Sequence, residues 1–399
     1  MALISVSEAL KRLSDNRSLL GVERVPLAQA HGRVLAEDLG AKLSQPPFDA
    51  SAMDGYAVRA ADVRALPATL ALVGESAAGA RYDGILEPGQ AVRIFTGAPV
   101  PDGADTVVIQ EDTEALGTSV LIKEAAAGCH IRPRGQDFLE GDVLLKIGTR
   151  LGARSVMLAA AMNYADVLVR RKPKVAILST GDEVMPPGSE LGPDQIVASV
   201  GYGIAAFVEA NGGIAIDLGI MGDDADALAE SVESANGADI LVTIGGASVG
   251  DRDLMQEVLG QAGMQPDFAK VAMRPGKPVF AGRLGDMRVL GLPGNPVSAL
   301  VCAVVFLRPM LGACLGWHRS IDPQCAILEC PLPENGARES YLRAISTLAS
   351  DGTRTVRPVP SQDSSLVSAL AESDCLIHRP QNAPPLPEGA TVIIWRLLD

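Results

Sequence analysis

The chain has 399 residues, in which 48 acidic side chains outnumber 34 basic ones and give a formal net charge of −14. This length supports about two to four domains with a substantial hydrophobic core. No Lys/Arg-rich run stands out in the sequence, so we expect small-molecule ligands and no nucleic acid partner.

Two features argue against secretion and against a membrane partner. Residues 1–13 read as an amphipathic helix with two basic residues rather than as a signal peptide. The longest apolar run, residues 297–307, is too short to span a bilayer and predicts a buried helix that ends before Arg308-Pro309. We therefore expect a cytoplasmic protein.

The cysteines form no Cys-x-x-Cys pair and have no histidine at zinc-finger spacing. This pattern favours reduced, mostly buried thiols over disulfides or a zinc site. The six residues are Cys129, Cys302, Cys314, Cys325, Cys330 and Cys375.

In chain order, the first part of the sequence predicts two domains. Residues 1–45 and 140–170 form an elongated N-terminal domain of helices and short strands. Its Ala-rich stretch 151–170 is predicted to be helical and is a candidate to pack with the N-terminal helix. Residues 46–139 form a small β-rich domain inserted into it, because short strand-like runs alternate there with Gly and Pro.

The second part of the sequence predicts an α/β domain at residues 171–318 and a β domain at residues 319–399. The α/β domain alternates strand and helix patterns, which is typical of a doubly wound, mostly parallel sheet with helices on both faces. Short strands broken by Gly and Pro predict a C-terminal β barrel or sandwich. The predicted α/β strands are residues 175–180, 214–219 and 239–244, and the predicted helices are residues 199–211, 225–235 and 254–261.

Polar residues gather where the predicted parallel strands end, which is where ligands of doubly wound sheets bind. Asp182 and Glu183 follow the first strand, and Asp223 and Asp224 follow the second. These acids are candidates to bind a metal ion or a hydroxyl group. Turn chemistry also explains Asp182, and a helix N-cap explains one of Asp223 and Asp224.

The third strand runs into a glycine-rich turn (GGASVGDRD) whose backbone N–H groups are suited to a phosphate. Gly245, Gly246 and Ser248 are its candidate binding residues, although an ordinary tight turn explains them equally well. Acids beside a phosphate commonly hold Mg²⁺. Asp253 is the better candidate for this role, because Asp251 also fits as a helix cap.

The Pro-Gly-Asn-Pro turn before the apolar helix predicts an anion site. Asn295 fits the N-cap and Pro296 fits the first helical position, so free N–H groups and the helix dipole favour a negative ligand. Ser298 lies in the first turn, and the upstream loop (RPGKP) adds Arg274 and Lys277. Helix packing for the serine and a solvated loop for the two cations are the alternatives.

Two further segments, PPFDASAMDGYAV at 46–58 and RIFTGAPVPDGAD at 93–105, have no role that their pattern alone assigns. Together with the GGASVGD, RPGKP and PGNPVS runs, they resemble the molybdopterin molybdenumtransferase family, which includes the gephyrin E domain. The resemblance covers essentially the whole chain. It implies insertion of molybdate into adenylylated molybdopterin, with Mg²⁺-assisted release of AMP and molybdenum cofactor. It also implies a homodimer, with a molybdopterin adenylyltransferase as a candidate further partner.

The resemblance implies roles for individual residues. Glu183, Asp223 and Asp253 match the metal-binding acids, and Glu183 and Asp253 are also implied in catalysis. Asp54 and Thr96 match catalytic residues that the other subunit of the dimer contributes. Cations, hydroxyl groups and N–H groups suit the tetrahedral molybdate dianion. The residues implied around molybdate and phosphate are Arg274, Lys277, Ser298, Arg343, Ser364, Gly245, Gly246, Ser248, Gly294 and Asn295.

The chain departs from the family pattern at three places. Ala198-Ser199-Val200 replaces the usual Asp-Ser-Asn or Ser-Asn run, Ile244 replaces a serine, and Arg274 replaces the commoner lysine. The transferase is the leading hypothesis. The alternatives are a molybdopterin-binding or scaffold paralogue with weak or no turnover, and an unrelated Mg²⁺-dependent phosphoryl-transfer enzyme. Activity gained on Val200→Asn plus Ile244→Ser would favour the paralogue.

Overall fold

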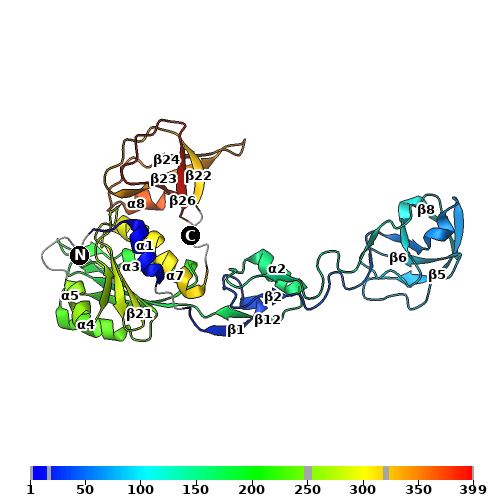
Figure 1. Ribbon diagram of the computed structural model, residues 1–399, viewed down its shortest axis with the longest axis horizontal. Helices are drawn as coiled ribbons and strands as arrows, with labels where there is room; N and C mark the ends of the chain where they lie inside the picture. The colour runs from blue at the N-terminus through cyan, green and yellow to red at the C-terminus, as the bar shows by residue number, and fades with distance from the viewer. Residues whose placement is uncertain (1–2, 16–18, 247–253, 318–322, 398–399) are drawn as a thin grey trace. The chain divides into compact units, whose positions relative to one another are not determined.

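The structure is a computed structural model that describes residues 3–15, 19–246, 254–317 and 323–397. The fold is of the α/β class, and the chain divides into two compact units (Figure 1). The larger unit comprises Met1–Glu23, Gly32–Ala36 and Leu168–Asp399, and the smaller unit comprises Arg24–His31 and Glu37–Val167.

A six-stranded sheet forms the centre of the larger unit. Its strand order is β16-β13-β17-β21-β20-β18, and the first four of these strands are parallel to one another. β20 runs antiparallel to β21, because a tight turn at Gly285-Asp286 joins these two strands directly. β18 in turn runs antiparallel to β20. The predicted parallel strands are confirmed, and the antiparallel edge makes the sheet mixed. The strands are β13 (Lys174–Thr180), β16 (Ile214–Met221), β17 (Ile240–Ile244), β18 (Gln265–Phe268), β20 (Phe280–Leu284) and β21 (Met287–Leu292).

Helices cover both faces of this sheet, as the doubly wound pattern predicts (Figure 1). Alternate residues of each strand point to opposite faces, so β13 sends Ile177 into one hydrophobic core and Leu178 into the other. One face packs against α1 (Val6–Asp15), α3 (Val200–Ala210), α6 (Pro296–Cys302) and α7 (Arg308–Leu315), and the other packs against α4 (Ala225–Ser234) and α5 (Leu254–Gln261).

The predictions for residues 151–170 are only partly correct. α2 (Ala153–Ala161) is helical, but Asp166–Arg170 forms strand β12, which pairs with β1 (Val22–Pro26). In this strand the buried side chains of Val167 and Val169 alternate with the half-buried side chains of Asp166, Leu168 and Arg170, as the two-residue period of a strand requires. α1 packs in the core of the larger unit, whereas α2 belongs to the smaller unit.

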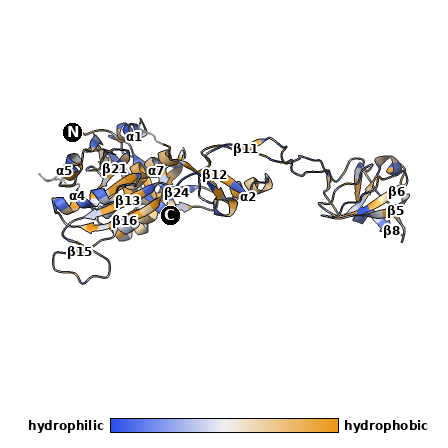
Figure 2. Ribbon diagram, turned by 90° about the horizontal axis from the view of Figure 1, so that it is seen from below, coloured by the Kyte–Doolittle hydropathy of each residue, from blue (hydrophilic) through white to orange (hydrophobic). Residues whose placement is uncertain are grey.

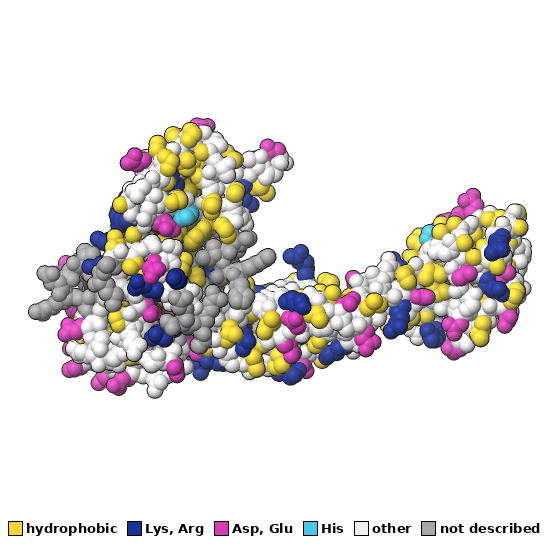
Figure 3. All heavy atoms as spheres, viewed as in Figure 1, with side chains coloured by type: hydrophobic (Ala, Val, Ile, Leu, Met, Phe, Trp, Pro, Cys, Tyr) yellow, Lys and Arg dark blue, Asp and Glu magenta, His cyan; other side chains and the backbone are white. Residues whose placement is uncertain are grey.

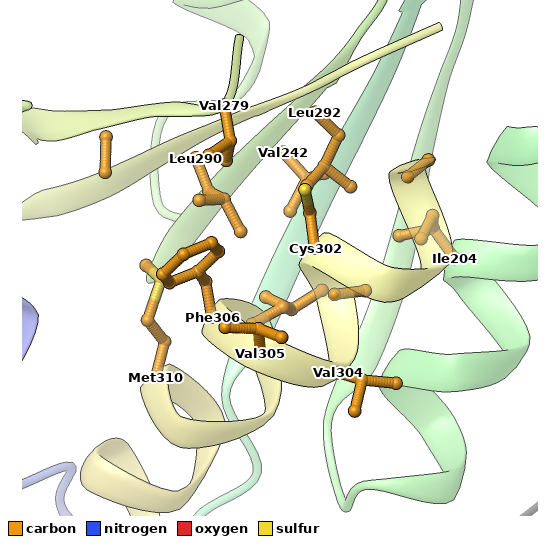
Figure 4. Close-up of a cluster of buried hydrophobic side chains, with 14 of the residues drawn as sticks. Ile204, Val242, Val279, Leu290, Leu292, Cys302, Val304, Val305, Phe306 and Met310 are labelled. Carbon is orange, nitrogen blue, oxygen red and sulfur yellow. The ribbon is translucent and has the colours of Figure 1, made fainter. Parts of the chain in front are cut away.

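The apolar helix predicted at 297–307 is longer than expected. It continues from Pro296 to Leu315, through a π-helical segment at Ala303–Leu307. Arg308 donates its N–H to the carbonyl of Ala303, five residues back, and Pro309 follows at the start of α7, where a missing N–H is tolerated. By length and composition this helix is able to cross a membrane, but 83% of its most apolar window is buried inside the protein, which is typical of a core helix. Figure 4 shows its side chains packed under β17 and β21.

The C-terminal strands close into a barrel, which decides between the two predicted alternatives. Five strands pair in the circular order β23-β24-β22-β26-β25, and β25 pairs again with β23. The short strand β19 (Met273–Arg274) adds to β23 in parallel. Helix α8 (Val367–Ala371) lies between two of the barrel strands in the sequence. The barrel strands are β22 (Pro323–Leu328), β23 (Glu339–Leu348), β24 (Arg354–Pro358), β25 (Cys375–Arg379) and β26 (Thr391–Arg396).

The smaller unit is rich in short strands, as predicted. Its main sheet has the order β7-β4-β6-β5-β9-β8, and two hydrophobic clusters lie on its faces. Two short strand pairs, β2-β11 and β3-β10, lie outside this sheet. The strands are β2 (Leu39–Gly40), β3 (Ala50–Ser51), β4 (Gly55–Val58), β5 (Ala68–Ser76), β6 (Gln90–Ile94), β7 (Thr106–Ile109), β8 (Thr113–Ala115), β9 (Ser119–Ile122), β10 (Ile131–Arg132) and β11 (Val143–Leu145).

All six cysteines are free, as predicted, but only three of them are buried. Burial raises the pKa of the Cys314 thiol to about 11 and that of Cys375 to about 12, and it raises the pKa of Cys302 further. Cys129 and Cys330 are half-buried, and Cys325 is exposed. The expectation of mostly buried thiols is therefore correct only for the α/β core and one barrel strand.

Ile244, which replaces the serine usual in the family, is a core residue. It is the last residue of β17, only 4% exposed, and it packs in the same hydrophobic cluster as Val242 and Val297. The side chain at this position therefore points into the core, and a serine there would place a hydroxyl group among apolar side chains.

We expect Ile244→Ser to lower the free energy of unfolding by about 3–5 kcal/mol, because it removes buried methyl groups and adds a buried hydroxyl. Ile244→Val should lower it by about 1 kcal/mol. Urea unfolding followed by circular dichroism measures both. Equal, small effects of the two substitutions would contradict the core position.

Candidate functional site

The connections that follow the four parallel strands all lie at one edge of the sheet. Because β16, β13, β17 and β21 run in the same direction, their carboxyl ends meet there. Two of the connections touch directly, since a Cβ atom on Gly294 would lie 3.6 Å from the Cα of Gly245. The predicted convergence of the Asp182, Asp223, Gly245 and Asn295 loops is therefore confirmed.

Gly245 allows this close approach through its backbone conformation. Its φ is +94°, and a Cβ atom would lie 2.6 Å from the Thr180 carbonyl oxygen. Its N–H donates to the carbonyl of Leu292 at 3.2 Å, so that amide is not available to a phosphate. The expected phosphate role of Gly245 is therefore corrected to a steric one. Gly246 follows directly, and Ser248 and Asp253 lie outside the described residues.

Three exposed carboxylates stand at the ends of β13 and β16. The backbone N–H of Asp223 donates to Oδ1 of Asp182 at 3.0 Å. Partial burial raises the pKa of the Asp223 carboxyl group, and the negative charges of Asp182 and Glu183 raise it further. Asp224 is the N-cap of α4 and accepts from the Ala227 N–H at 2.9 Å. The N-cap alternative thus applies to Asp224 and leaves Asp223 as the candidate ligand.

Within the part of the chain that the structure describes, no group of three or more Asp, Glu, His or Cys side chains is arranged to hold a metal ion. The predicted metal set of Glu183, Asp223 and Asp253 includes one residue outside that part. The acids that are described, Asp182, Glu183 and Asp223, lie close enough for their charges to interact.

The N-terminus of α6 differs from the expected open anion site. Asn295 is the N-cap and Pro296 the first helical residue, as predicted. The Asn295 side chain does not cap the helix, however, but donates to Oγ of Ser364 at 3.2 Å. The Val297 N–H donates to the Ser364 carbonyl at 3.1 Å. A loop of the barrel domain has therefore taken one of the helix amides, and it brings the Ser364 hydroxyl to this turn.

Arg343 holds that loop in place. The guanidinium is almost fully buried and donates to the carbonyls of Leu366, Ser361 and Asp363 at 3.0, 2.9 and 2.8 Å. These three hydrogen bonds attach the Arg343 guanidinium to the loop that carries Ser364, whereas its buried Nε has no hydrogen-bond partner among the described residues. The expectation that Arg343 binds an anion directly stays a prediction.

Arg274 is the last residue of β19, and Lys277 lies in the connection between β19 and β20. Arg274 is exposed, Lys277 is half-buried, and neither forms an ion pair with any described residue. The loop packs on α6, since a Cβ atom on Gly276 would lie 2.3 Å from Sγ of Cys302. Ser298 follows in the first turn of α6 and is 5% exposed. On the face drawn in Figure 3, basic side chains are scattered among acidic ones.

In the smaller unit, Asp54 and Thr96 form one hydrogen-bonded pair. The Thr96 N–H and hydroxyl donate to Oδ1 of Asp54 at 2.7 and 2.8 Å. These two bonds and the nearby Arg93 charge lower the pKa of the Asp54 carboxyl group. Arg93 itself donates to the Gly55 carbonyl and to Gln110. The resemblance alone singled out this pair, because no pattern links two loop residues so far apart in the sequence.

Comparison with known protein families covers nearly the whole chain. Residues 4–163 match the MoeA N-terminal region (domains I and II), and residues 176–313 match a probable molybdopterin binding domain. Residues 326–397 match the MoeA C-terminal region (domain IV).

Individual relatives agree with these matches. A molybdopterin molybdenumtransferase from Nostoc sp. is 36% identical over 94% of this chain and 88% of its own length. One from Haemophilus influenzae is 35% identical over 93% of both chains. Two crystal structures of the molybdopterin biosynthesis MoeA protein from Pyrococcus horikoshii superpose with TM-scores of 0.84 and 0.85, at 32% and 28% identity. They cover 100% and 99% of this chain and 100% of their own chains. The chain belongs to the molybdopterin molybdenumtransferase family, whose enzymes act in molybdenum cofactor biosynthesis.

Proposed function

We propose that the enzyme inserts molybdate into adenylylated molybdopterin and releases AMP and molybdenum cofactor in a Mg²⁺-dependent reaction. The observation that carries the proposal is the charge arrangement around one edge of the sheet. Acidic loops follow β13 and β16, and the basic loop with Arg274 and Lys277 packs on α6, which starts at the same edge. The acidic loops suit the cation that assists cleavage of a phosphoanhydride, and the basic loop suits an oxyanion.

We assign molybdate to the basic side of this site. Arg274 and Lys277 have no ionic partner among the described residues, so their charges are available to a dianion. The Ser298 side chain lies in the first turn of α6, and Ser364 is held at the same turn by Asn295. Hydroxyl donors of this kind fix the orientation of a tetrahedral oxyanion.

We assign Mg²⁺ to the acidic side. Carboxylate oxygens are the ligands that Mg²⁺ prefers. Partial burial raises the pKa of Asp223, the negative charges of Asp182 and Glu183 raise it further, and a cation would relieve that repulsion. The donor chemistry therefore fits, with Glu183, Asp223 and Asp253 as the proposed ligands. When bound, the ion polarises the phosphoanhydride. The chain's own carboxylates hold the charge that attracts it.

We further propose a homodimer in which Asp54 and Thr96 complete the site of the other subunit. The hydrogen bonds from Thr96 lower the pKa of the Asp54 carboxyl group and so favour its ionised form. An ionised, rigidly held carboxylate is suited to orient a reacting group or a water molecule. A molybdopterin adenylyltransferase is the proposed partner that supplies the adenylylated substrate.

A molybdopterin-binding protein with weak or no turnover is the second candidate function. The departure at Ala198-Ser199-Val200 motivates it, because the amide side chain expected there is missing. The departure at Ile244 no longer supports it, since that side chain belongs to the core.

The decisive experiment follows AMP release. Full-length protein incubated with adenylylated molybdopterin, molybdate and Mg²⁺ should release AMP and form molybdenum cofactor. Removal of divalent metal with a chelator should abolish the release, and added Mg²⁺ should restore it, because the acidic loops need the cation. Tight substrate binding without AMP release, in protein with a native circular dichroism spectrum, would favour the binding protein instead.

Substitution of Asp223 tests the acidic side. Asp223→Asn should reduce AMP release about 100-fold or more, because it removes a charged ligand. Asp224→Asn is the matched control: Asn also caps helices, so the helix and the activity should persist.

The same substitution has a pH signature in metal-free protein. A raised carboxyl pKa destabilises the folded state only when the group is ionised, so the penalty appears as pH rises through that pKa. Asp223→Asn should therefore raise the thermal unfolding temperature relative to the original protein at neutral pH, and the difference should vanish in acid. An equal difference at both pH values would contradict the charge repulsion.

Subunit mixing tests the composite site. Asp54→Asn and Asp223→Asn should each be inactive, but a mixture that exchanges subunits should recover about a quarter of the original activity, since half of the dimers then contain one intact site. No recovery, despite subunit exchange shown by native mass spectrometry, would place both residues in the site of one subunit.

A further inference from the structure

A cavity of about 470 Å³ opens beside the carboxyl ends of β13 and β16, on the face of the sheet that α3 covers. This volume lies within the range of small-molecule sites. The loop that carries β14 (Val184–Met185) and β15 (Ile196–Val197) forms another wall, and Figure 2 shows it as an excursion from the sheet. None of the residues in the predicted anion site lines this cavity.

A bulge in β16 shapes the floor of the cavity. Ile177 of β13 pairs with Asp217, but two residues later Ser179 pairs with Ile220, so β16 has one extra residue at this point. Gly219 adopts a φ of +85° there, and its N–H donates to Oδ1 of Asp217 at 2.9 Å. Bulges re-aim side chains beside binding sites. Here the bulge fixes the Asp217 carboxylate, whose Oδ2 has no hydrogen-bond partner among the described residues.

The lining selects the kind of ligand. Among the described residues, the lining contains the carboxylates of Asp182 and Asp217 and no Lys, Arg or His. Two negative charges disfavour phosphate and molybdate and favour a group rich in hydrogen-bond donors. Met185, Ile220 and the ring of Tyr202, which is 57% exposed, supply apolar surface suited to a flat ring system.

We infer that this cavity binds the pterin ring of the molybdopterin substrate, with Asp217 accepting two hydrogen bonds from its amino group and the adjacent ring N–H. The inference rests on the proposed function, which places molybdopterin at this edge of the sheet. A pterin presents two neighbouring donors that match a carboxylate. The adenine amino group is flanked by acceptor nitrogens, which the second carboxylate oxygen repels.

The inference also predicts where the pterin and the phosphate of the substrate lie relative to each other along the edge of the sheet. Asp182 lines the cavity and also accepts from the Asp223 N–H, so the cavity adjoins the proposed Mg²⁺ ligands. Gly201 permits this arrangement, because a Cβ atom there would lie 3.0 Å from Oγ of Ser179 and the first turn of α3 packs close to β13. The pterin then lies on the α3 side, with the phosphate next to the acids.

Pterin itself is the probe, since it lacks the phosphate, the dithiolene and the adenylyl group. Its own fluorescence, titrated with full-length protein, measures its dissociation constant. Asp217→Asn should weaken binding about 10- to 100-fold, because the amide replaces one acceptor with a donor that faces a donor. Tyr202→Ala should weaken it about 3- to 10-fold, whereas Tyr202→Phe should keep it. Asp226→Asn, on α4 and outside the cavity, is the control for loss of one charge and should bind normally.

With the complete substrate, Asp217→Asn should raise KM with kcat nearly unchanged, because the ring is held equally before and during the reaction. Unchanged pterin binding in Asp217→Asn, or competition by AMP for the pterin site, would overturn the inference. If the original protein releases no AMP but binds pterin through Asp217, the proposed function fails and the ring site stands. If it releases AMP but Asp217→Asn leaves pterin binding unchanged, the proposed function stands and the ring site fails.

Discussion

The burial of one apolar helix is the constraint on which the larger unit depends. From Pro296 to Leu315 this helix lies against the α/β sheet, and its side chains pack with residues of β17, β21, α1 and α3 (Figure 4). Burial on this scale is the main source of stability in a domain of this kind. The same helix also positions residues of the candidate site. Its first turn lies at the edge of the sheet where the loops converge, and both the Ser364 loop and Gly276 contact it.

The candidate site has an acidic region and a basic region that form no ion pair with each other among the described residues. The acids at the ends of β13 and β16 repel each other, and this repulsion adds to partial burial in raising the pKa of Asp223. Arg274 and Lys277 have no ionic partner among the described residues. Unpaired charges of this kind reduce the stability of the ligand-free protein, and the proposed metal ion and oxyanion would compensate for them.

Several residues of the site make supporting contacts within the protein. Arg343 donates three hydrogen bonds to backbone carbonyls of the Ser364 loop, and Gly245 allows a close approach while its N–H bonds to Leu292. Ile244 contributes core packing. The type of a residue and its position in the sequence do not show whether it contacts a ligand or supports the loop that does. In either case the same residue type lies beside the same loop.

The sequence by itself determined the α/β class, the parallel strands and the edge at which their loops converge, whereas the order of the strands in the sheet came from the structure. Hydrophobic periodicity is local, and right-handed connections leave few topologies for a βαβ pattern. Its motifs also established the family, since they extend over the whole chain. Local patterns failed at β12, and at Pro309, where a π-helical segment let the helix continue.

Only the tertiary structure decided which polar groups remain available to a ligand. The Val297 amide is taken by a residue 67 positions later in the chain, the Thr96 hydroxyl by Asp54, and the Asp217 carboxylate is aimed by a bulge that no spacing reveals. These are contacts between segments distant in the sequence. Hydrogen bonding of a buried group depends on what packs against it, and that is a property of the folded chain.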